Sequence, residues 1–218
     1  MSKLLVFDLD GTLIHSAPDI VETANIVLDE FNRSRLPEEQ IVSYIGHGLM
    51  RLIEDLFPEH KDNPAELERI ANRFRSVYEV QMYNRTHLYP GVTDFLNAWD
   101  GKIGIVTNKR RGPAIAMMKH LGLDRYPWVD VFGYDSFDEA KPSPKPLREM
   151  MLKAQIPPEN TLMIGDGVPD MQSALNAGIK SLAIGFGYTD PQVLKAYNPI
   201  AVFFHFKELK ELLSRHGF

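Results

Sequence analysis

The sequence predicts an α/β fold in which a doubly wound parallel sheet carries an inserted all-helical segment. Short, wholly apolar runs such as Leu4 to Phe7 are typical of strands buried on both faces. After about Tyr89, such runs alternate with amphipathic helical patterns, as in a parallel sheet with helical crossovers. Between Pro18 and His87 no strand pattern is found, and this stretch is longer than a crossover needs.

The first strand pattern, Leu4 to Phe7, ends on Asp8, and Asp10 and Gly11 follow. Glycine lets the backbone turn sharply. Two carboxylates this close are costly unless a cation neutralises them or one holds a proton. They stand at the carboxyl end of a strand, where open α/β sheets bind ligands. The alternative is that both acids only favour a turn and cap the next helix.

Residues 17–88 are predicted to form the inserted helical domain, and residues 1–16 with 89–218 the α/β core. Helix starts are expected at Ser16 with Pro18, at Pro37, near Leu49 and at Pro64. The last helix has an apolar stripe that favours core packing, made of Leu67, Ile70, Ala71, Phe74, Val77, Tyr78 and Gln81. The turn Tyr89-Pro90-Gly91 marks the return to the core.

The second half of the chain predicts alternating strands and helices. Strands are expected at 102–106, 129–134, 161–164, 181–184 and 200–204. Helices are expected at 114–121, 144–154, 169–177 and 207–215. This spacing indicates a parallel sheet with right-handed crossovers.

The composition narrows the class of partner. The 218 residues carry a formal net charge of −5, which argues against nucleic acid or an anionic membrane as the main partner. The absence of cysteine excludes disulfides, thiolate zinc sites and a cysteine nucleophile. No apolar stretch is long enough for a signal peptide or a membrane span, so we expect a cytoplasmic protein.

Four polar clusters follow predicted strands or begin predicted helices: Asp8 with Asp10, Thr107 with Asn108, Lys141, and Asp166 with Asp170. Because parallel strands end at one edge of a sheet, these side chains can converge. Each has an ordinary explanation by itself: Asn108 as a helix cap, Lys141 as a solvated lysine, Asp170 as an acid in a first helical turn. Together they favour a functional site.

These residue types suit phosphoryl transfer. The carboxylates of Asp8, Asp10 and Asp166 are hard oxygen ligands of the kind Mg²⁺ prefers. A carboxylate can also be the nucleophile and form an aspartyl-phosphate. A lysine and short hydroxyl or amide donors would stabilise the charge on the transferred group. Without catalysis, the same groups would make a Mg²⁺- or phosphate-binding module.

The four clusters resemble, in order, the four motifs of the haloacid dehalogenase superfamily: Asp8-Leu9-Asp10-Gly11-Thr12, Thr107-Asn108, Lys141-Pro142, and Gly165-Asp166 with Asp170. The resemblance implies a Rossmann-like core with a helical cap domain inserted between the first two motifs. It implies that Asp8 is the nucleophile and Asp10 the general acid and then base. Thr107, with Asn108, and Lys141 would hold the phosphoryl group. Mg²⁺ would be bound by Asp8, the Asp10 backbone carbonyl and Asp166, with Asp170 supporting the site.

Within the superfamily the chain most resembles phosphoglycolate phosphatases. The likeness lies in Asp-Gly-Thr-Leu at the start, Ser16-Ala17-Pro18-Asp19, Gly46-His47-Gly48-Leu49 and Thr107-Asn108-Lys109; His15 and Gly167 depart from the pattern. It implies Mg²⁺-dependent hydrolysis of a small phosphorylated metabolite such as 2-phosphoglycolate. A substrate carboxylate would need a cation, for which His47, Arg51 and Arg110 are candidates. The alternatives are a sugar phosphomutase, a pyrophosphatase or a non-catalytic phosphate-binding module, and less so a dehalogenase.

Overall fold

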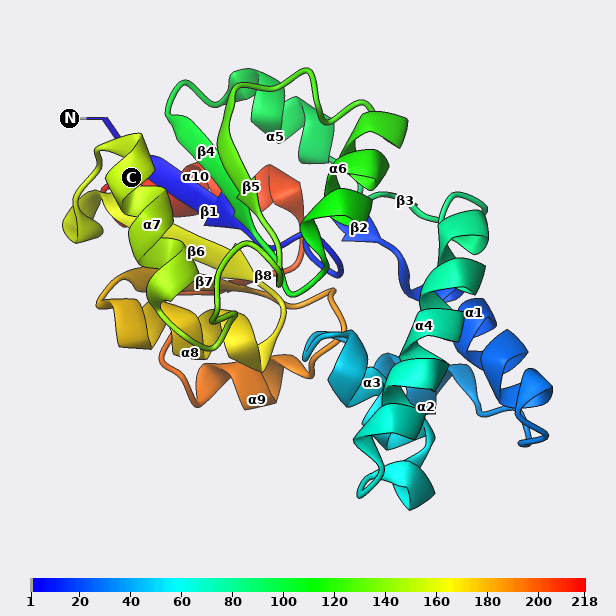
Figure 1. Cartoon of the computed structure of the whole chain (residues 1–218). Coiled ribbons are helices and arrows are strands. Elements are labelled where there is room, and N and C mark those ends of the chain that lie inside the picture. Colours follow the sequence, from blue (N-terminus) through cyan, green and yellow to red (C-terminus); the bar gives the residue numbers. More distant parts are fainter. Residues whose placement is uncertain (1) are drawn as a thin grey trace. The chain divides into compact units, whose positions relative to one another are not determined.

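The computed structural model describes residues 2–218, which fall into two compact units (Figure 1). The first contains the chain up to His15 together with Leu88–Phe218, and the second contains Ser16–His87. Within residues 2–218, no helix is both long enough and apolar enough to cross a membrane.

The first unit is built on a parallel sheet of six strands in the order β5-β4-β1-β6-β7-β8. The strand β1 (Leu4–Phe7) lies between β4 (Lys102–Val106) and β6 (Thr161–Gly165). The outer strands are β5 (Trp128–Phe132), β7 (Lys180–Ile184) and β8 (Val202–Phe203). Phe7 is level with Ile105 and Ile164, so the segments that follow these three strands begin side by side. The predicted α/β fold is confirmed.

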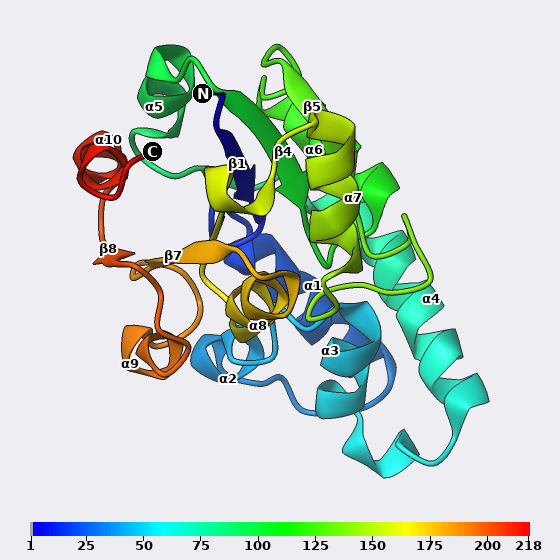
Figure 2. The same cartoon turned by 90° about the vertical axis from the view of Figure 1, so that its left-hand side faces the viewer.

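Helices cover both faces of this sheet (Figure 2). Alternate side chains of a strand point to opposite faces, and both faces are apolar, so both must be covered. Leu4 and Val6 belong to the apolar cluster that α7 (Lys145–Ala154) and α8 (Val168–Ala177) complete on one face. Phe7 points to the other face and meets Phe95 of α5 (Val92–Ala98) edge to face at 6.1 Å. Phe95 in turn packs on Phe206 of α10 (Phe206–Arg215). The remaining helices of this unit are α6 (Arg111–His120) and α9 (Pro191–Lys195).

The second unit consists of α1 (Ala17–Glu30), α2 (Glu38–Val42), α3 (Leu49–Leu56), the 3₁₀ turn Pro58–His60 and α4 (Pro64–Gln81). α4 packs against α1 and α3. The residues of the predicted stripe are buried from Leu67 to Tyr78, but its last member, Gln81, is only half-buried. The carboxylate of Asp19 on α1 accepts hydrogen bonds from the backbone N–H groups of Arg85 and Thr86. The start of α1 is thereby fixed to the segment that follows α4.

Several short elements were absent from the sequence prediction: β2 (Ile14–His15), β3 (His87–Leu88), α5, α9 and the 3₁₀ turn Pro158–Asn160. α5 has only seven residues and follows Gly91, whose φ of 87° is left-handed. Two turns of helix are too short for a readable apolar period. α6 begins at Arg111, three residues before the predicted start, because Pro113 still lies among the first residues, whose N–H groups have no intrahelical partner.

Candidate active site

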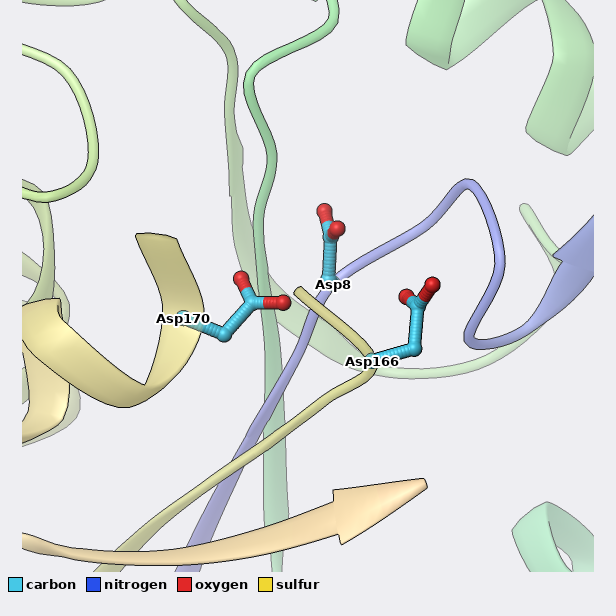
Figure 3. A group of neighbouring side chains, drawn as sticks. All are labelled: Asp8, Asp166 and Asp170. Atoms are coloured by element: carbon cyan, nitrogen blue, oxygen red, sulfur yellow. The ribbon is translucent and has the colours of Figure 1, made fainter. Parts of the chain in front are cut away.

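Three acids meet at the carboxyl edge of the sheet. Asp8 follows β1, Asp166 follows β6, and Asp170 lies in the first turn of α8. All three are buried, and each offers a carboxylate oxygen within 4.8 Å of those of the other two. In Figure 3, the carboxylates of Asp166 and Asp170 stand on either side of that of Asp8. The convergence expected from the order of the strands is present for these residues.

The turn after β1 requires glycine at position 11. Gly11 has a φ of +82°, and a Cβ there would lie 2.1 Å from the Asp166 carboxylate oxygen Oδ2. Both the left-handed backbone and the missing side chain are therefore needed for Asp166 to approach this turn.

We expect Gly11→Ala to lower phosphoester turnover more than about 100-fold and stability by about 2 kcal/mol, since it adds strain and displaces Asp166. Gly112→Ala is the matched control. Apart from its chain neighbours and the backbone of its own helix, no described atom lies within 4 Å of a Cβ at Gly112, and its φ is not left-handed. The control should change stability by at most about 1 kcal/mol. Thermal unfolding and activity of both variants test the requirement; a Gly11→Ala protein with normal activity contradicts it.

Asp166 is fixed by two hydrogen bonds. Its Oδ1 accepts from the Thr12 hydroxyl at 2.8 Å, and its Oδ2 accepts from the Tyr188 backbone N–H at 2.9 Å. Burial nevertheless raises the pKa of Asp166 to about 8, and the nearby charges of Asp8 and Asp170 add to the effect. The folded chain therefore disfavours the ionised form of this carboxyl group when no further cation is present.

Asp8 and Asp170 share one buried lysine. The Lys141 ammonium lies 3.0 Å from Asp8 Oδ1 and also contacts Asp170 Oδ1. Burial lowers the pKa of Lys141, but the two carboxylates outweigh it, so the net pKa is raised and the ammonium stays charged. For Asp8, burial dominates over Lys141 and raises the pKa to about 7.

A divalent cation fits this set of donors. Asp8 Oδ1 lies 3.0 Å from the Lys141 ammonium, and no other donor in the described part of the chain bonds this buried oxygen. Both oxygens of Asp170, in contrast, are engaged, one with Lys141 and the other with the Gly167 backbone N–H. Burial, together with the neighbouring acids, raises the pKa of Asp8 and of Asp166, so a further cation would stabilise their ionised forms. Hard carboxylate oxygens with excess negative charge are what Mg²⁺ binds.

The raised pKa values predict how the stability of the metal-free protein depends on pH. Asp8 and Asp166 have folded-state pKa values of about 7 and about 8, against 3.8 as the ordinary value. Between about pH 4 and pH 8 the folded chain therefore binds more protons than the unfolded chain, so its stability should fall as the pH rises. Mg²⁺ should raise the melting temperature more at pH 8 than at pH 5. Thermal unfolding with EDTA or Mg²⁺ measures this, and an equal effect of Mg²⁺ at both pH values contradicts it.

The Thr107 and Asn108 cluster supports the segment that carries Lys141. Asn108 donates a hydrogen bond from its amide Nδ2 to the Lys141 backbone carbonyl at 3.1 Å, and both residues are buried. Thr107 is also buried, and its hydroxyl accepts from the Lys109 backbone N–H at 3.2 Å. Asn108 thus holds the segment that carries Lys141, whereas the N-cap position of α6 is occupied by Arg110.

The Asp10 side chain lies outside this buried group of three acids. The sequence predicts Asp8, Asp10 and Asp166 as metal ligands, Asp10 through its backbone carbonyl, and the buried carboxylates that group together are those of Asp8, Asp166 and Asp170. The Asp10 carboxylate instead faces Lys109, whose ammonium lies 3.1 and 3.2 Å from its two oxygens. Position along the chain predicts the sheet edge that an acid reaches, but not the direction of its side chain.

The three predicted specificity residues lie in different surroundings. Arg110 pairs with Asp135 at 3.1 Å and is 52% exposed. Arg51 belongs to the helical unit, is 56% exposed, and pairs with Asp55 and Glu54. His47 lies in the same unit, between α2 and α3.

The loop after β7 also contributes to the site, and the strand and helix patterns of the sequence do not predict this. A Cβ on Gly187 would lie 2.1 Å from the Asp166 Cβ, and the next residue, Tyr188, donates its N–H to Asp166. The segment Gly185-Phe186-Gly187 directly after a strand was the signal of a tight loop at the same sheet edge. The sequence pattern likewise predicts no separate role for Lys109, which contacts Asp10.

The fold and these acids agree with the comparison with known families. The sequence profile of the haloacid dehalogenase-like hydrolases matches residues 5–184, which is most of the chain. The chain therefore belongs to the haloacid dehalogenase-like hydrolase family.

Two individual relatives match most of the chain. A protein of Rhodospirillum rubrum named phosphoglycolate phosphatase is 32% identical, over 98% of this chain and 92% of its own length. One of Nitrosospira multiformis with the same name is 34% identical, over 86% of this chain and 85% of its own.

Solved structures agree in fold. A crystal structure from Haemophilus somnus 129pt, described as a predicted phosphoglycolate phosphatase, superposes with a TM-score of 0.89 at 26% identity, covering 97% of each chain. A hydrolase from Pseudomonas syringae has a TM-score of 0.83 at 24% identity over 98% of each chain, and this likeness concerns the fold alone.

Proposed function

We propose that the chain is a Mg²⁺-dependent phosphatase that hydrolyses a small phosphomonoester, with 2-phosphoglycolate as the candidate substrate. The observation that carries the proposal is the surroundings of Asp8. Its buried oxygen Oδ1 faces the charged ammonium of Lys141 at 3.0 Å, has no other donor in the described part of the chain, and lies beside two further acids. The names of the relatives in Rhodospirillum rubrum and Nitrosospira multiformis support the choice of substrate.

In the proposed reaction Asp8 is the nucleophile and Asp10 transfers protons. A carboxylate oxygen of Asp8 forms a bond to phosphorus while the bond from phosphorus to the ester oxygen breaks. Asp10 gives its proton to that leaving oxygen and later takes a proton from water. The water oxygen then attacks the phosphorus of the aspartyl-phosphate, which releases inorganic phosphate and restores Asp8.

The other site residues would hold the phosphoryl group in line with Asp8. Lys141 places a buried positive charge 3.0 Å from the attacking carboxylate and would stabilise negative charge on the transferred oxygens. Thr107 and Asn108 would contribute a hydroxyl and an amide. Asp8, Asp166 and the Asp10 backbone carbonyl would hold Mg²⁺, with Asp170 supporting them. When bound, Mg²⁺ would neutralise charge on the phosphoryl oxygens.

We also propose that residues 17–88 act as a cap domain for a core made of 1–16 and 89–218. Two features support this division. The helical stretch is inserted between the cluster of Asp8 with Asp10 and the cluster of Thr107 with Asn108. In addition, Ser16–His87 forms a compact unit by its own contacts. His47 and Arg51 would then be available for substrate recognition from the cap.

A phosphate-release screen with Mg²⁺ tests the function. We expect the wild-type protein to release phosphate from small phosphomonoesters, with 2-phosphoglycolate among the preferred ones, and to lose turnover when EDTA replaces Mg²⁺. Isomerisation of a sugar phosphate without phosphate release would favour a mutase, and preference for pyrophosphate would favour a pyrophosphatase. Absence of turnover over the whole panel would favour a phosphate-binding module and overturn the proposal.

A further inference from the structure

Lys109 is held firmly beside Asp10. Its backbone N–H donates to the Thr107 hydroxyl at 3.2 Å, and its carbonyl accepts from the Tyr134 N–H at 2.9 Å. The ammonium contacts both Asp10 oxygens, and the exposed fractions of the two side chains are only 9% and 13%. A lysine fixed at both its backbone and its charged end is preorganised for a defined ligand.

The position of Lys109 places a positive charge on the leaving-group side of the reaction. To give a proton to the ester oxygen, Asp10 has to come within hydrogen-bond distance of it, about 3 Å. The Lys109 nitrogen lies 3.1 and 3.2 Å from the Asp10 oxygens. The ammonium is therefore within about 6 Å of the place where the ester oxygen would lie, which is within reach of a group attached next to that oxygen. In 2-phosphoglycolate, the carboxylate is attached to the carbon that carries this oxygen.

We propose that Lys109 is a specificity-determining residue that binds a carboxylate on the leaving group. The inference rests on the proposed function and defines its substrates as phosphomonoesters with a negative charge close to the ester oxygen. One oxygen of the substrate carboxylate would replace one Asp10 oxygen at the ammonium, and that Asp10 oxygen would turn to the ester oxygen. Lys109 would thus bind the substrate and position Asp10 at the same time.

The electrostatics of the site favour Lys109 for this role. Asp8, Asp10, Asp166 and Asp170 repel a further carboxylate unless a cation faces it. Lys141 is already engaged with Asp8 and Asp170. Arg110 is the candidate cation that the sequence offers in the core unit. Its side chain is largely exposed and pairs with Asp135. An exposed cation of this kind gains little free energy from contact with an anion. The Lys109 side chain is 9% exposed against 52% for Arg110, so water weakens its contact with an anion less.

The test compares 2-phosphoglycolate with ethyl phosphate, which has the same leaving-group length but no carboxylate. In Lys109→Met, we expect the ratio of the two kcat/KM values, phosphoglycolate over ethyl phosphate, to fall by about 10- to 100-fold, mainly through KM. Lys109→Arg keeps a cation and should retain most of the preference. Lys119→Met, on the exposed side of α6, is the matched control and should leave the ratio unchanged. Lys109→Gln repeats the comparison, so the result does not depend on the folding of one variant.

Two outcomes would overturn the inference while leaving the phosphatase proposal intact. One is an equal loss of kcat/KM for both substrates in the neutral variants, which would mean that Lys109 acts only through Asp10. The other is a wild-type enzyme that does not prefer phosphoglycolate to ethyl phosphate. Failure of the wild-type protein to hydrolyse any phosphoester would instead refute the proposed function, and the inference with it.

Discussion

Asp8→Asn is expected to reduce phosphate release by about 10⁴-fold or more, because a side-chain amide does not attack phosphorus as a carboxylate does. The fold should remain. Burial raises the pKa of Asp8 to about 7, so the neutral amide removes a charge that the folded chain disfavours. In EDTA, the melting temperature of the variant should equal or exceed that of the wild type at pH 8.

The control for this variant is Asp100→Asn, which makes the same chemical change at an exposed acid two residues before β4, at the opposite edge of the sheet. It should keep full activity. Phosphate release and thermal unfolding of both variants provide the comparison. Substantial turnover by a folded Asp8→Asn protein would show that Asp8 is not the nucleophile.

Lys141→Met is expected to damage both stability and catalysis. The substitution removes the positive charge from between two buried carboxylates, those of Asp8 and Asp170. Loss of one partner of a buried ion pair typically costs about 3–5 kcal/mol, because the other charge stays buried and unpaired. Turnover should fall by about 10³-fold, since the charge that would stabilise the transferred phosphoryl group is lost.

A second substitution separates these two effects. In a Lys141→Met and Asp170→Asn double variant, one of the orphaned charges is removed, so stability in EDTA should partly recover while activity does not. Lys145→Met is the control, since Lys145 lies four residues further on, is 37% exposed and pairs with an exposed Asp138. An exposed pair contributes about 1 kcal/mol or less. Full stability of Lys141→Met would contradict the electrostatic account of the site.

The central sheet could be predicted because its strands are buried on both faces. Burial on both sides selects continuous apolar runs, and the runs at Leu4 to Phe7 and Lys102 to Val106 match β1 and β4 residue for residue. Short elements such as α5 and α9 could not be predicted in this way. They span one or two helical turns and leave no period to read.

The order of the parallel strands made part of the site predictable. The topology of a parallel sheet brings the ends of β1, β4 and β6 to one edge, so the meeting of Asp8 with Asp166 follows from the order of the elements. The pairing of Asp10 with Lys109 does not follow from it, nor does the approach of Gly187 to Asp166. These depend on side-chain direction and on the path of loops, which the apolar pattern does not encode.

The measurement that bears most directly on the account is chemical trapping of the aspartyl-phosphate. Borohydride reduces an acyl phosphate to the alcohol, so a phosphorylated aspartate becomes homoserine, which mass spectrometry of the peptide locates. With Mg²⁺ and a substrate that is being turned over, we predict homoserine at position 8, and none there when EDTA replaces Mg²⁺ or when Asp8→Asn is used. Conversion of a different carboxylate, or sustained turnover with position 8 unchanged, would contradict the assignment of Asp8 as the nucleophile.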